Sequence, residues 1–237
     1  MSETIIITGA SNGIGYHTAL KLAAENKRVI AVARKGELLH KLVTSVKENN
    51  SKSFIIPLVF DIANGNYEVL SNLLEREGID CVDALVNNAG MLINKPIGQL
   101  KTDDFRNIYE VNVFAPFMLI KQLLPLLKKS PKAHIVNISS MGGVQGSQKF
   151  AGLSAYSSSK GALAILTECM AVELSEMNIK INCLALGSAN TEMLASAFPG
   201  YRAPLSAAEM AEWIAWFTMN GQNYFNGKII PVALSSP

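Results

Sequence analysis

The chain has 237 residues and a net charge of +2; 17% of its residues are charged and 49% are hydrophobic. These values are typical of a soluble globular protein with a sizeable core, and the length fits one large α/β domain. The basic residues are dispersed, so no stripe could follow a phosphate backbone and we expect no nucleic-acid partner. The three cysteines show neither a disulfide framework nor zinc-ligand spacing, so no metal site is expected.

The first residues, Met1-Ser-Glu-Thr, lead directly into a strand pattern. No basic segment stands before an apolar one, so the sequence does not predict a secretory signal. The most apolar later region, residues 114–127, is interrupted by Pro116, Lys121 and Pro125. We therefore expect no membrane-spanning segment and a cytoplasmic location.

Short β-branched runs alternate with longer helical patterns along the whole chain. The predicted strands are Thr4–Thr8, Arg28–Ala33, Ser53–Phe60, Ala84–Asn87, Ala133–Ser139, Lys180–Ala185 and Lys228–Leu234. The predicted helices are Gly13–Asn26, Gly36–Asn49, Tyr67–Glu77, Thr102 to about Lys129, Tyr156 to about Met177, and one capped by Ser206 that reaches about Asn220. This alternation predicts an α/β fold, a single Rossmann-type domain over residues 1–237 with a doubly wound, seven-stranded parallel sheet.

The strand cores, such as Ile5-Ile6-Ile7, are apolar throughout, as expected for strands that are covered on both faces. In such a sheet a ligand binds beyond the carboxyl ends of the strands, where the strand order reverses.

A glycine-rich turn, Thr8–Gly15, lies between the first strand and the first helix. Gly9 permits the tight turn, Gly13 lets the backbone approach a pyrophosphate, and Gly15 lets helix and strand pack closely. The free N–H groups at the helix start favour phosphate. The turn therefore predicts a dinucleotide site, with contacts from Gly9, Ser11, Asn12, Gly13, Ile14 and Gly15.

The second strand ends in Ala33-Arg34-Lys35, where an acidic residue would bind the ribose hydroxyl of NAD(H). No acidic residue is present, and Arg34 fits a 2′-phosphate, so NADP(H) is favoured over NAD(H). Glu37 lies close enough to keep NAD(H) open, and Arg34 has the alternative of being an ordinary exposed arginine.

Tyr156 and Lys160 stand four residues apart at the start of a predicted helix and so share one face. A phenol has an ordinary pKa of about 10, and a nearby cation lowers it. The pair could therefore give or take a proton near neutral pH. A second pair with the same spacing, Tyr224 and Lys228, spans an Asn-Gly turn signal and would not share a helix face. The alternative for Tyr156 and Lys160 is an amphipathic helix end with a solvated lysine.

With these motifs the chain resembles the short-chain dehydrogenases/reductases, in their compact single-domain subclass, from Thr4 to about Val232. The motifs that carry the resemblance occur in the family's order: Thr8–Gly15, Asp61-Ile62, Asn87-Asn-Ala-Gly90, Asn112, Asn137-Ile-Ser-Ser140, and Tyr156 with Lys160. The resemblance implies hydride transfer between a nicotinamide and a carbonyl or alcohol carbon of a small molecule. It also implies cofactor contacts from Asp61, Ile62, Asn88, Ala89, Gly90, Tyr156, Lys160 and Thr191.

The resemblance implies a catalytic role for four residues. In reduction, Tyr156 would protonate the developing alkoxide, and Lys160 would lower the tyrosine pKa and hold the nicotinamide ribose. Ser140 would hydrogen-bond the substrate oxygen. Asn112 would hold a water in a proton relay toward Lys160. Ser139 is the rival serine, since neighbouring strand residues face opposite ways, and the family pattern favours Ser140.

The chain departs from the family pattern near the expected substrate site. The segment between Ser140 and Tyr156 is a few residues longer than usual. Gln145, Gln148 and Phe150 would line or cover the site, or else form a surface bulge. Leu186-Gly187 replaces the usual Pro-Gly, and residues 190–206 form a short substrate-lid segment, which predicts an open pocket.

The sequence leaves two alternatives to a hydride-transferring enzyme. A non-catalytic NADP(H)-sensing protein would need the glycine turn but not the serine, tyrosine and lysine. A sugar-nucleotide epimerase would need a larger substrate region. The helix that starts at Tyr156 is apolar nearly all round. It is either buried within one copy or forms, with the helix near Asp103, the interface of a homodimer or homotetramer.

Overall fold

The computed structural model describes residues 2–49 and 54–234. Its main sheet has seven parallel strands: β1 (Thr4–Thr8), β2 (Arg28–Ala33), β3 (Phe54–Val59), β4 (Ala84–Asn87), β5 (His134–Ser140), β6 (Lys180–Leu186) and β9 (Ile229–Val232). Their order in space is β3-β2-β1-β4-β5-β6-β9, so the order reverses between β1 and β4. The predicted Rossmann-type fold and its seven parallel strands are confirmed.

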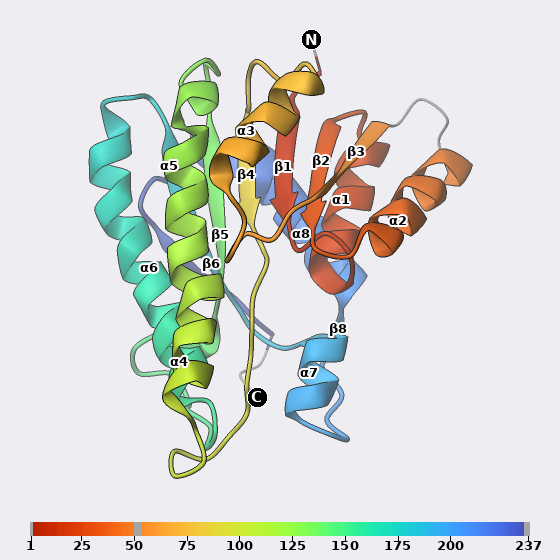
Figure 1. Cartoon of the computed structure of the whole chain (residues 1–237). Helices are drawn as coiled ribbons and strands as arrows, with labels where there is room; N and C mark the ends of the chain where they lie inside the picture. The colour runs from red at the N-terminus through yellow and green to blue at the C-terminus, as the bar shows by residue number, and fades with distance from the viewer. Residues whose placement is uncertain (1, 50–53, 235–237) are drawn as a thin grey trace.

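Helices cover both faces of this sheet (Figure 1). The main ones are α1 (Gly13–Ala24), α2 (Gly36–Asn49), α3 (Tyr67–Arg76), α4 (Thr102–Tyr109), α5 (Ala115–Leu127), α6 (Ser154–Ser175) and α8 (Ala207–Asn220). Ile5 and Ile7 belong to the core beneath α1, α2 and α8, whereas Ile6 belongs to the core beneath α3, α5 and α6. Because successive strand residues point to opposite faces, the continuous apolar runs supply both cores at once.

The helix predicted from Thr102 to about Lys129 is interrupted in the structure. A π-helical turn, η1 (Glu110–Phe114), stands between α4 and α5. A π turn adds one residue to the helical repeat and often occurs at functional sites. The hydrophobic periodicity that predicted the helix cannot detect a single added residue. The turn places Asn112 in a fully buried position.

Residues 190–206, predicted as a short lid, contain small elements that the sequence did not indicate. They are β7 (Ala189–Asn190), the short helix α7 (Glu192–Ala197) and β8 (Leu205–Ser206). Most other predicted bounds agree with the structure within two residues, and the predicted strand start at Ser53 lies outside the described residues.

The helical segment Thr102–Leu127 contains an 18-residue stretch with a mean hydropathy of 1.3, so by length and composition alone it could cross a membrane. Its apolar side chains have another explanation, since Leu119, Ile120 and Leu123 are buried in the core between the sheet and its covering helices. Phe114 and Phe117 on the same segment are 50% and 40% exposed. The cytoplasmic location stays a prediction.

His134, at the start of β5, ties three elements together, although its sequence position suggested no role. Its Nδ1 lies 3.0 Å from the carbonyl oxygen of Thr218 in α8, and its Nε2 lies 3.0 Å from Nδ2 of Asn182 in β6. A neutral ring that donates from Nδ1 and accepts at Nε2 satisfies both contacts. Burial lowers the pKa of His134 to about 4, and the bond to Thr218 opposes this only in part.

This buried neutral ring predicts a specific loss of stability in acid. Between pH 6.5 and about 4, the unfolded chain binds a proton at His134 that the folded protein does not. The free energy of unfolding should therefore fall as the pH falls through this window, by about 3 kcal/mol in total. Urea unfolding at pH 7.5 and 4.5 should show wild type losing about 2–3 kcal/mol more than His134→Gln, which cannot titrate.

The exposed His40 provides the control. His40→Gln should retain the wild-type pH dependence of unfolding. Equal losses of stability in wild type and His134→Gln between the two pH values would contradict the assignment.

Candidate active site

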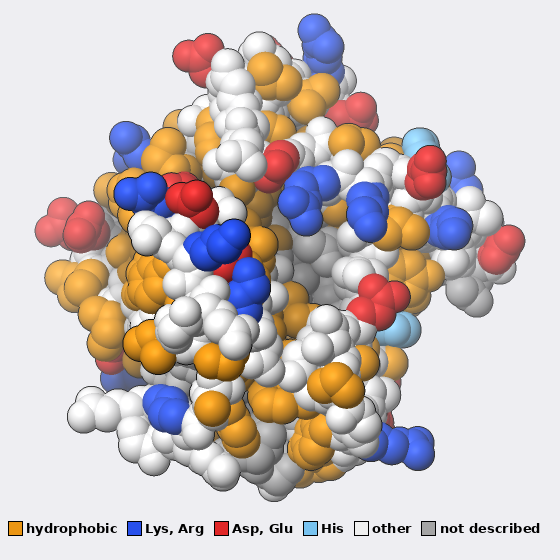
Figure 2. Space-filling model, turned by 60° about the horizontal axis from the view of Figure 1, so that its bottom comes forward, with side chains coloured by type: hydrophobic (Ala, Val, Ile, Leu, Met, Phe, Trp, Pro, Cys, Tyr) orange, Lys and Arg blue, Asp and Glu red, His pale blue; other side chains and the backbone are white. Residues whose placement is uncertain are grey.

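The main cleft of the protein lies at the carboxyl end of the sheet, where β1 and β4 end side by side. It has a volume of about 420 Å³. Figure 2 looks onto this end and shows a hollow near its centre, with Lys and Arg side chains around it. The predicted site residues that line the cleft are Gly9, Ser11, Asn12, Gly13, Ile14, Arg34, Asp61, Ile62, Asn88, Ala89, Gly90, Ser140, Tyr156, Lys160 and Thr191. Gly15 and Asn112 are not among the lining residues. Each of them contacts residues that do line the cleft.

The glycine turn packs directly on the segment that follows β4. A Cβ atom on Gly15 would lie 2.3 Å from Nδ2 of Asn88, and one on Gly9 would lie 2.8 Å from Cα of Ala89. The hydroxyl oxygen of Thr8 accepts hydrogen bonds from the N–H groups of Asn88 and Ala89, at 3.1 and 3.0 Å. Gly15 is therefore a packing residue, and side chains at either glycine would push the two segments apart.

The start of α1 offers backbone donors to the cleft. Asn12 stands at the N-cap but makes no side-chain capping bond to the helix. Its Nδ2 instead donates to Oε2 of Glu192, at the start of α7, over 3.1 Å. Gly13 has a φ of +57°, a conformation that favours glycine. The first N–H groups of α1 therefore have no side-chain cap from Asn12 and are suited to an anion.

Charge of both signs lies at the far end of the cleft from Tyr156. The Asp61 carboxylate accepts hydrogen bonds from the Ala63 N–H (3.0 Å) and Nδ2 of Asn64 (3.2 Å). Burial pushes the pKa of Asp61 upward, but these bonds and the positive charge of Arg34 outweigh it and hold the pKa below its ordinary value. Asp61 is therefore ionised, and Arg34 is exposed beside it.

Ser140 and Tyr156 form a hydrogen-bonded pair in the cleft. Tyr156 lies in the first turn of α6 and bonds to the side chain of Ser140 at the end of β5. Burial raises the pKa of Tyr156, and the Ser140 bond offsets this only in part. The phenol is therefore protonated at neutral pH. The Ser140 oxygen also accepts the Gly142 N–H at 3.1 Å, which fixes the orientation of the side chain.

Ser139 has a different role from its neighbour. Its hydroxyl donates to the backbone carbonyl of Lys160 over 2.8 Å, and the residue is only 4% exposed. Behind this bond, a Cβ on Gly143 would lie 2.6 Å from the backbone nitrogen of Gly161, so the loop and α6 touch through their backbones. Ser139 thus fastens β5 to α6, and Ser140 is the serine beside the phenol.

Lys160 is buried, and its amino group faces the backbone. Nζ donates to the Ile138 carbonyl over 2.8 Å and lies 5.9 Å from the centroid of the Tyr156 ring. Burial lowers the pKa of Lys160 to about 8, and the nearby Cys183 acts weakly in the opposite direction. Burial outweighs the opposing effects on Tyr156, since the pKa of Tyr156 lies above its ordinary value. The lowering of this pKa by Lys160 stays a prediction.

Asn112 connects three segments through its side-chain amide. Oδ1 accepts the Met91 N–H at 2.8 Å, and Nδ2 donates to the Met91 carbonyl and to Oγ of Ser159, both at 2.9 Å. Ser159 in turn donates to the Tyr156 carbonyl over 2.7 Å. The side chain of Asn112 is thus engaged in positioning the segment after β4 against α6. Oδ1 accepts one of the two hydrogen bonds that an amide oxygen can accept, and the relay water stays a prediction.

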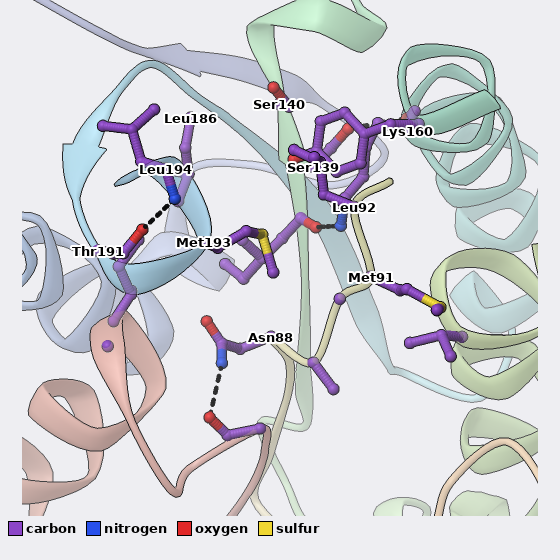
Figure 3. Close-up of a pocket in the computed structure, with 18 of the residues that line it drawn as sticks. Asn88, Met91, Leu92, Ser139, Ser140, Lys160, Leu186, Thr191, Met193 and Leu194 are labelled. Carbon is purple, nitrogen blue, oxygen red and sulfur yellow. Dashed lines mark hydrogen bonds between the residues drawn. The ribbon is translucent and has the colours of Figure 1, made fainter. Parts of the chain in front are cut away.

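The cleft wall near Tyr156 includes apolar residues that the sequence did not single out. They are Met91, Leu92, Leu153, Met193, Leu194 and Phe198. Of the candidates in the longer loop, Gln148 and Phe150 line the cleft and Gln145 does not; Leu186 lines it as well. In Figure 3, Met193 points from α7 into the space in front of Ser139 and Leu92, and Thr191 caps α7 through a bond from the Leu194 N–H. Apolar loop residues match no sequence motif, so only the structure shows that these residues line the cleft.

Comparison with known proteins agrees with this arrangement. The sequence profile described as short chain dehydrogenase matches residues 3–202. The chain belongs to the short-chain dehydrogenase family.

Relatives in this family are oxidoreductases. Cyclopentanol dehydrogenase from Comamonas testosteroni is 32% identical over 193 residues, which are 81% of this chain and 74% of that protein. L-xylulose reductase from Caenorhabditis elegans is 38% identical over 183 residues, or 76% of this chain and 69% of that protein. This short-chain dehydrogenase is accordingly an oxidoreductase.

Solved structures of similar proteins share the whole fold. A short chain dehydrogenase from Escherichia coli CFT073, crystallised with NADPH, superposes with a TM-score of 0.87 at 29% identity, covering 97% of this chain and 95% of that one. L-sorbose reductase from Gluconobacter frateurii, crystallised with NADPH and L-sorbose, has a TM-score of 0.85 at 25% identity, with coverage of 98% and 95%.

Proposed function

We propose that this short-chain dehydrogenase uses NADP(H) to interconvert a small-molecule carbonyl and its alcohol. The observation that carries the proposal is the Ser140–Tyr156 pair, which opens into the same cleft as the glycine turn and Arg34. When bound, the nicotinamide supplies or accepts the hydride. The uncapped start of α1 would bind the pyrophosphate, with Asn88, Ala89 and Gly90 along one wall and Thr191 on the other.

The catalytic residues favour carbonyl reduction. Hydride arrival places negative charge on the substrate oxygen, so hydrogen-bond donors must already point there. Tyr156 is protonated at neutral pH, because a phenol has an ordinary pKa of about 10 and burial raises the pKa of Tyr156 further; its hydroxyl would give its proton to that oxygen. Ser140 would donate a hydrogen bond to the same oxygen. Lys160, with a pKa of about 8, can lose and regain a proton near neutral pH and so help to reprotonate the phenol.

A non-catalytic NADP(H) sensor remains the alternative, but it has no use for this serine and tyrosine. The proposal predicts that Tyr156→Phe lowers kcat for carbonyl reduction by about 1,000-fold, because general acid catalysis is lost. The affinity for NADPH, followed by quenching of protein fluorescence, should change less than about 3-fold, because the phenol oxygen makes no contact with the glycine turn.

Tyr224→Phe is the matched control, since Tyr224 begins the second Tyr-Lys pair and is 73% exposed. It should keep wild-type kcat. Full turnover by Tyr156→Phe would remove Tyr156 from the proposed mechanism.

The preference for NADP(H) is proposed on Arg34, which is exposed at the end of β2 with Lys35 next to it. A charge-assisted hydrogen bond to a 2′-phosphate contributes about 1.5–3 kcal/mol. Arg34→Ala should therefore raise the KM for NADPH by about 10-fold or more and leave the KM for NADH unchanged. Steady-state kinetics with both nucleotides measures this.

Arg106→Ala is the control, because Arg106 is an exposed residue of α4 whose partner is Asp103. It should change neither KM. Equal kcat/KM values of the wild type for NADH and NADPH would refute the cofactor preference. They would not affect the proposed roles of the catalytic residues.

We further propose that two or more copies associate through α5 and α6. Phe114, Phe117 and Met118 on η1 and α5 are 40–50% exposed, and Ile165 and Val172 on α6 are 58% and 76% exposed. Ile165 and Val172 are seven residues apart and share a helix face. The alternative of burial within one copy does not account for these side chains.

A charge on this face should separate the copies. Val172→Glu should shift the sedimentation coefficient to that of a 25.6-kDa monomer, because a carboxylate is costly to bury in an apolar interface. Val69→Glu, on the exposed side of α3, should retain the wild-type assembly. A wild-type protein that sediments as a monomer at micromolar concentration would contradict the proposal.

A further inference from the structure

We infer that the carbonyl substrate is an uncharged, mainly apolar ketone, in which the carbonyl is the only strongly polar group. This rests on the proposed function and adds the substrate class. The region that carries it, here called the substrate chamber, is the part of the cleft next to Ser140 and Tyr156. Its apolar wall consists of Leu92, Phe150, Leu153, Met193, Leu194 and Phe198.

Three separate segments build the substrate chamber. Leu92 follows β4, Phe150 and Leu153 come from the loop before α6, and Met193 and Phe198 come from α7 and the residue after it. Figure 3 shows Leu92 and Met193 on opposite sides of the space in front of Ser139. An apolar wall on several sides favours a substrate with an apolar body, because the transfer of apolar surface out of water lowers the free energy.

Contacts among the three segments hold the chamber in a fixed shape. Nδ2 of Asn94 donates to the Ala197 carbonyl over 2.8 Å, and the Lys95 N–H donates to the Gly152 carbonyl over 3.0 Å. The rings of Phe150 and Phe198 meet edge to face, with their centroids 5.5 Å apart. The short lid, residues 190–206, predicted an open pocket. In the structure this segment is hydrogen-bonded to the segment after β4 and packs on the loop before α6.

Close packing supports the same conclusion. Gly152 has a φ of +85°, and a Cβ there would lie 2.0 Å from Oδ1 of Asn94. No side chain fits at this position, so the loop backbone rests directly on the Asn94 side chain. A preformed apolar chamber selects substrates by shape and polarity, because it cannot rearrange to supply new hydrogen bonds.

Of the two cations among the described lining residues, one lies away from the substrate chamber and the other is bonded to backbone. Among the described lining residues the cations are Arg34, at the opposite end, and Lys160, whose Nζ bonds to the Ile138 carbonyl. Glu192 is engaged by Asn12 of the glycine turn. A substrate carboxylate or phosphate would therefore enter the chamber without a cationic partner, and additional hydroxyls that do not reach the exposed amide of Gln148 would lose their hydrogen bonds to water.

The test compares ring ketones that differ at one substituent. The substrates are 4-methylcyclohexanone, 4-hydroxycyclohexanone and 4-oxocyclohexanecarboxylate, each with NADPH. We expect kcat/KM to fall by about 10-fold or more with the hydroxyl and about 100-fold or more with the carboxylate, since a rigid apolar pocket discriminates on this scale. Equal kcat/KM for the methyl and hydroxyl compounds, or a preference for the carboxylate, would overturn the inference.

The small diketone 2,3-butanedione separates this inference from the proposed function. Reduction of butanedione without preference for the methyl compound would overturn the substrate class alone. Failure to reduce butanedione and all three ring ketones would overturn the proposed function, and the substrate class with it.

Met193→Gln tests the chamber wall with a side chain of similar size. Met193 is 41% exposed, so the variant should fold. The ratio of kcat/KM for the methyl compound to that for the hydroxyl compound should fall about 5-fold or more, because the amide can bond to the hydroxyl. Gln145→Ser, at an exposed position of the loop before α6 that does not line the cleft, should leave all values unchanged. An unchanged ratio in Met193→Gln would place the substrate body elsewhere and overturn the inference.

Discussion

The attachment of α6 to the end of β5 determines the geometry of the whole site. Ser139 binds the backbone carbonyl of Lys160, and the Lys160 side chain returns to the carbonyl of Ile138. With the strand end and the first two turns of the helix joined in both directions, Ser140 and Tyr156 have one relative position. The same close packing removes water from the phenol and raises its pKa. The packing of a helix start on a strand end therefore fixes the orientation of the phenol and also raises its pKa.

A second attachment brings the rest of the cleft to this pair. The π turn buries Asn112, whose amide holds both backbone groups of Met91 and the hydroxyl of Ser159. Without the added residue of the π turn, the asparagine side chain would point in another direction, because each helical residue turns the side chains by about 100°. The segment after β4, which packs on the glycine turn, is thus positioned relative to Tyr156. The nucleotide site and Tyr156 are therefore held in a fixed position relative to each other.

Local sequence patterns predicted those parts of the structure that depend on neighbouring residues in the chain. Apolar runs indicate buried parallel strands, and a glycine turn between strand and helix is a local feature, so the fold and most cleft residues were predicted. The π turn at Asn112 was not, since it depends on partners some 20 to 50 residues away in sequence. The raised pKa of Tyr156 was missed for a related reason. The spacing to Lys160 implied an electrostatic effect, but the depth of burial is set by tertiary packing.

The contact between Gly152 and Asn94 constrains how enzymes of this design can diversify. The loop before α6 touches the segment after β4 through its backbone and the Asn94 side-chain amide, and that amide also holds the end of α7. Inserting or deleting a residue in any one of the three would break the fit of the other two. New specificities on this scaffold are therefore accessible through side-chain exchange at positions such as Phe150 and Phe198, while changes of loop length require all three segments to change together.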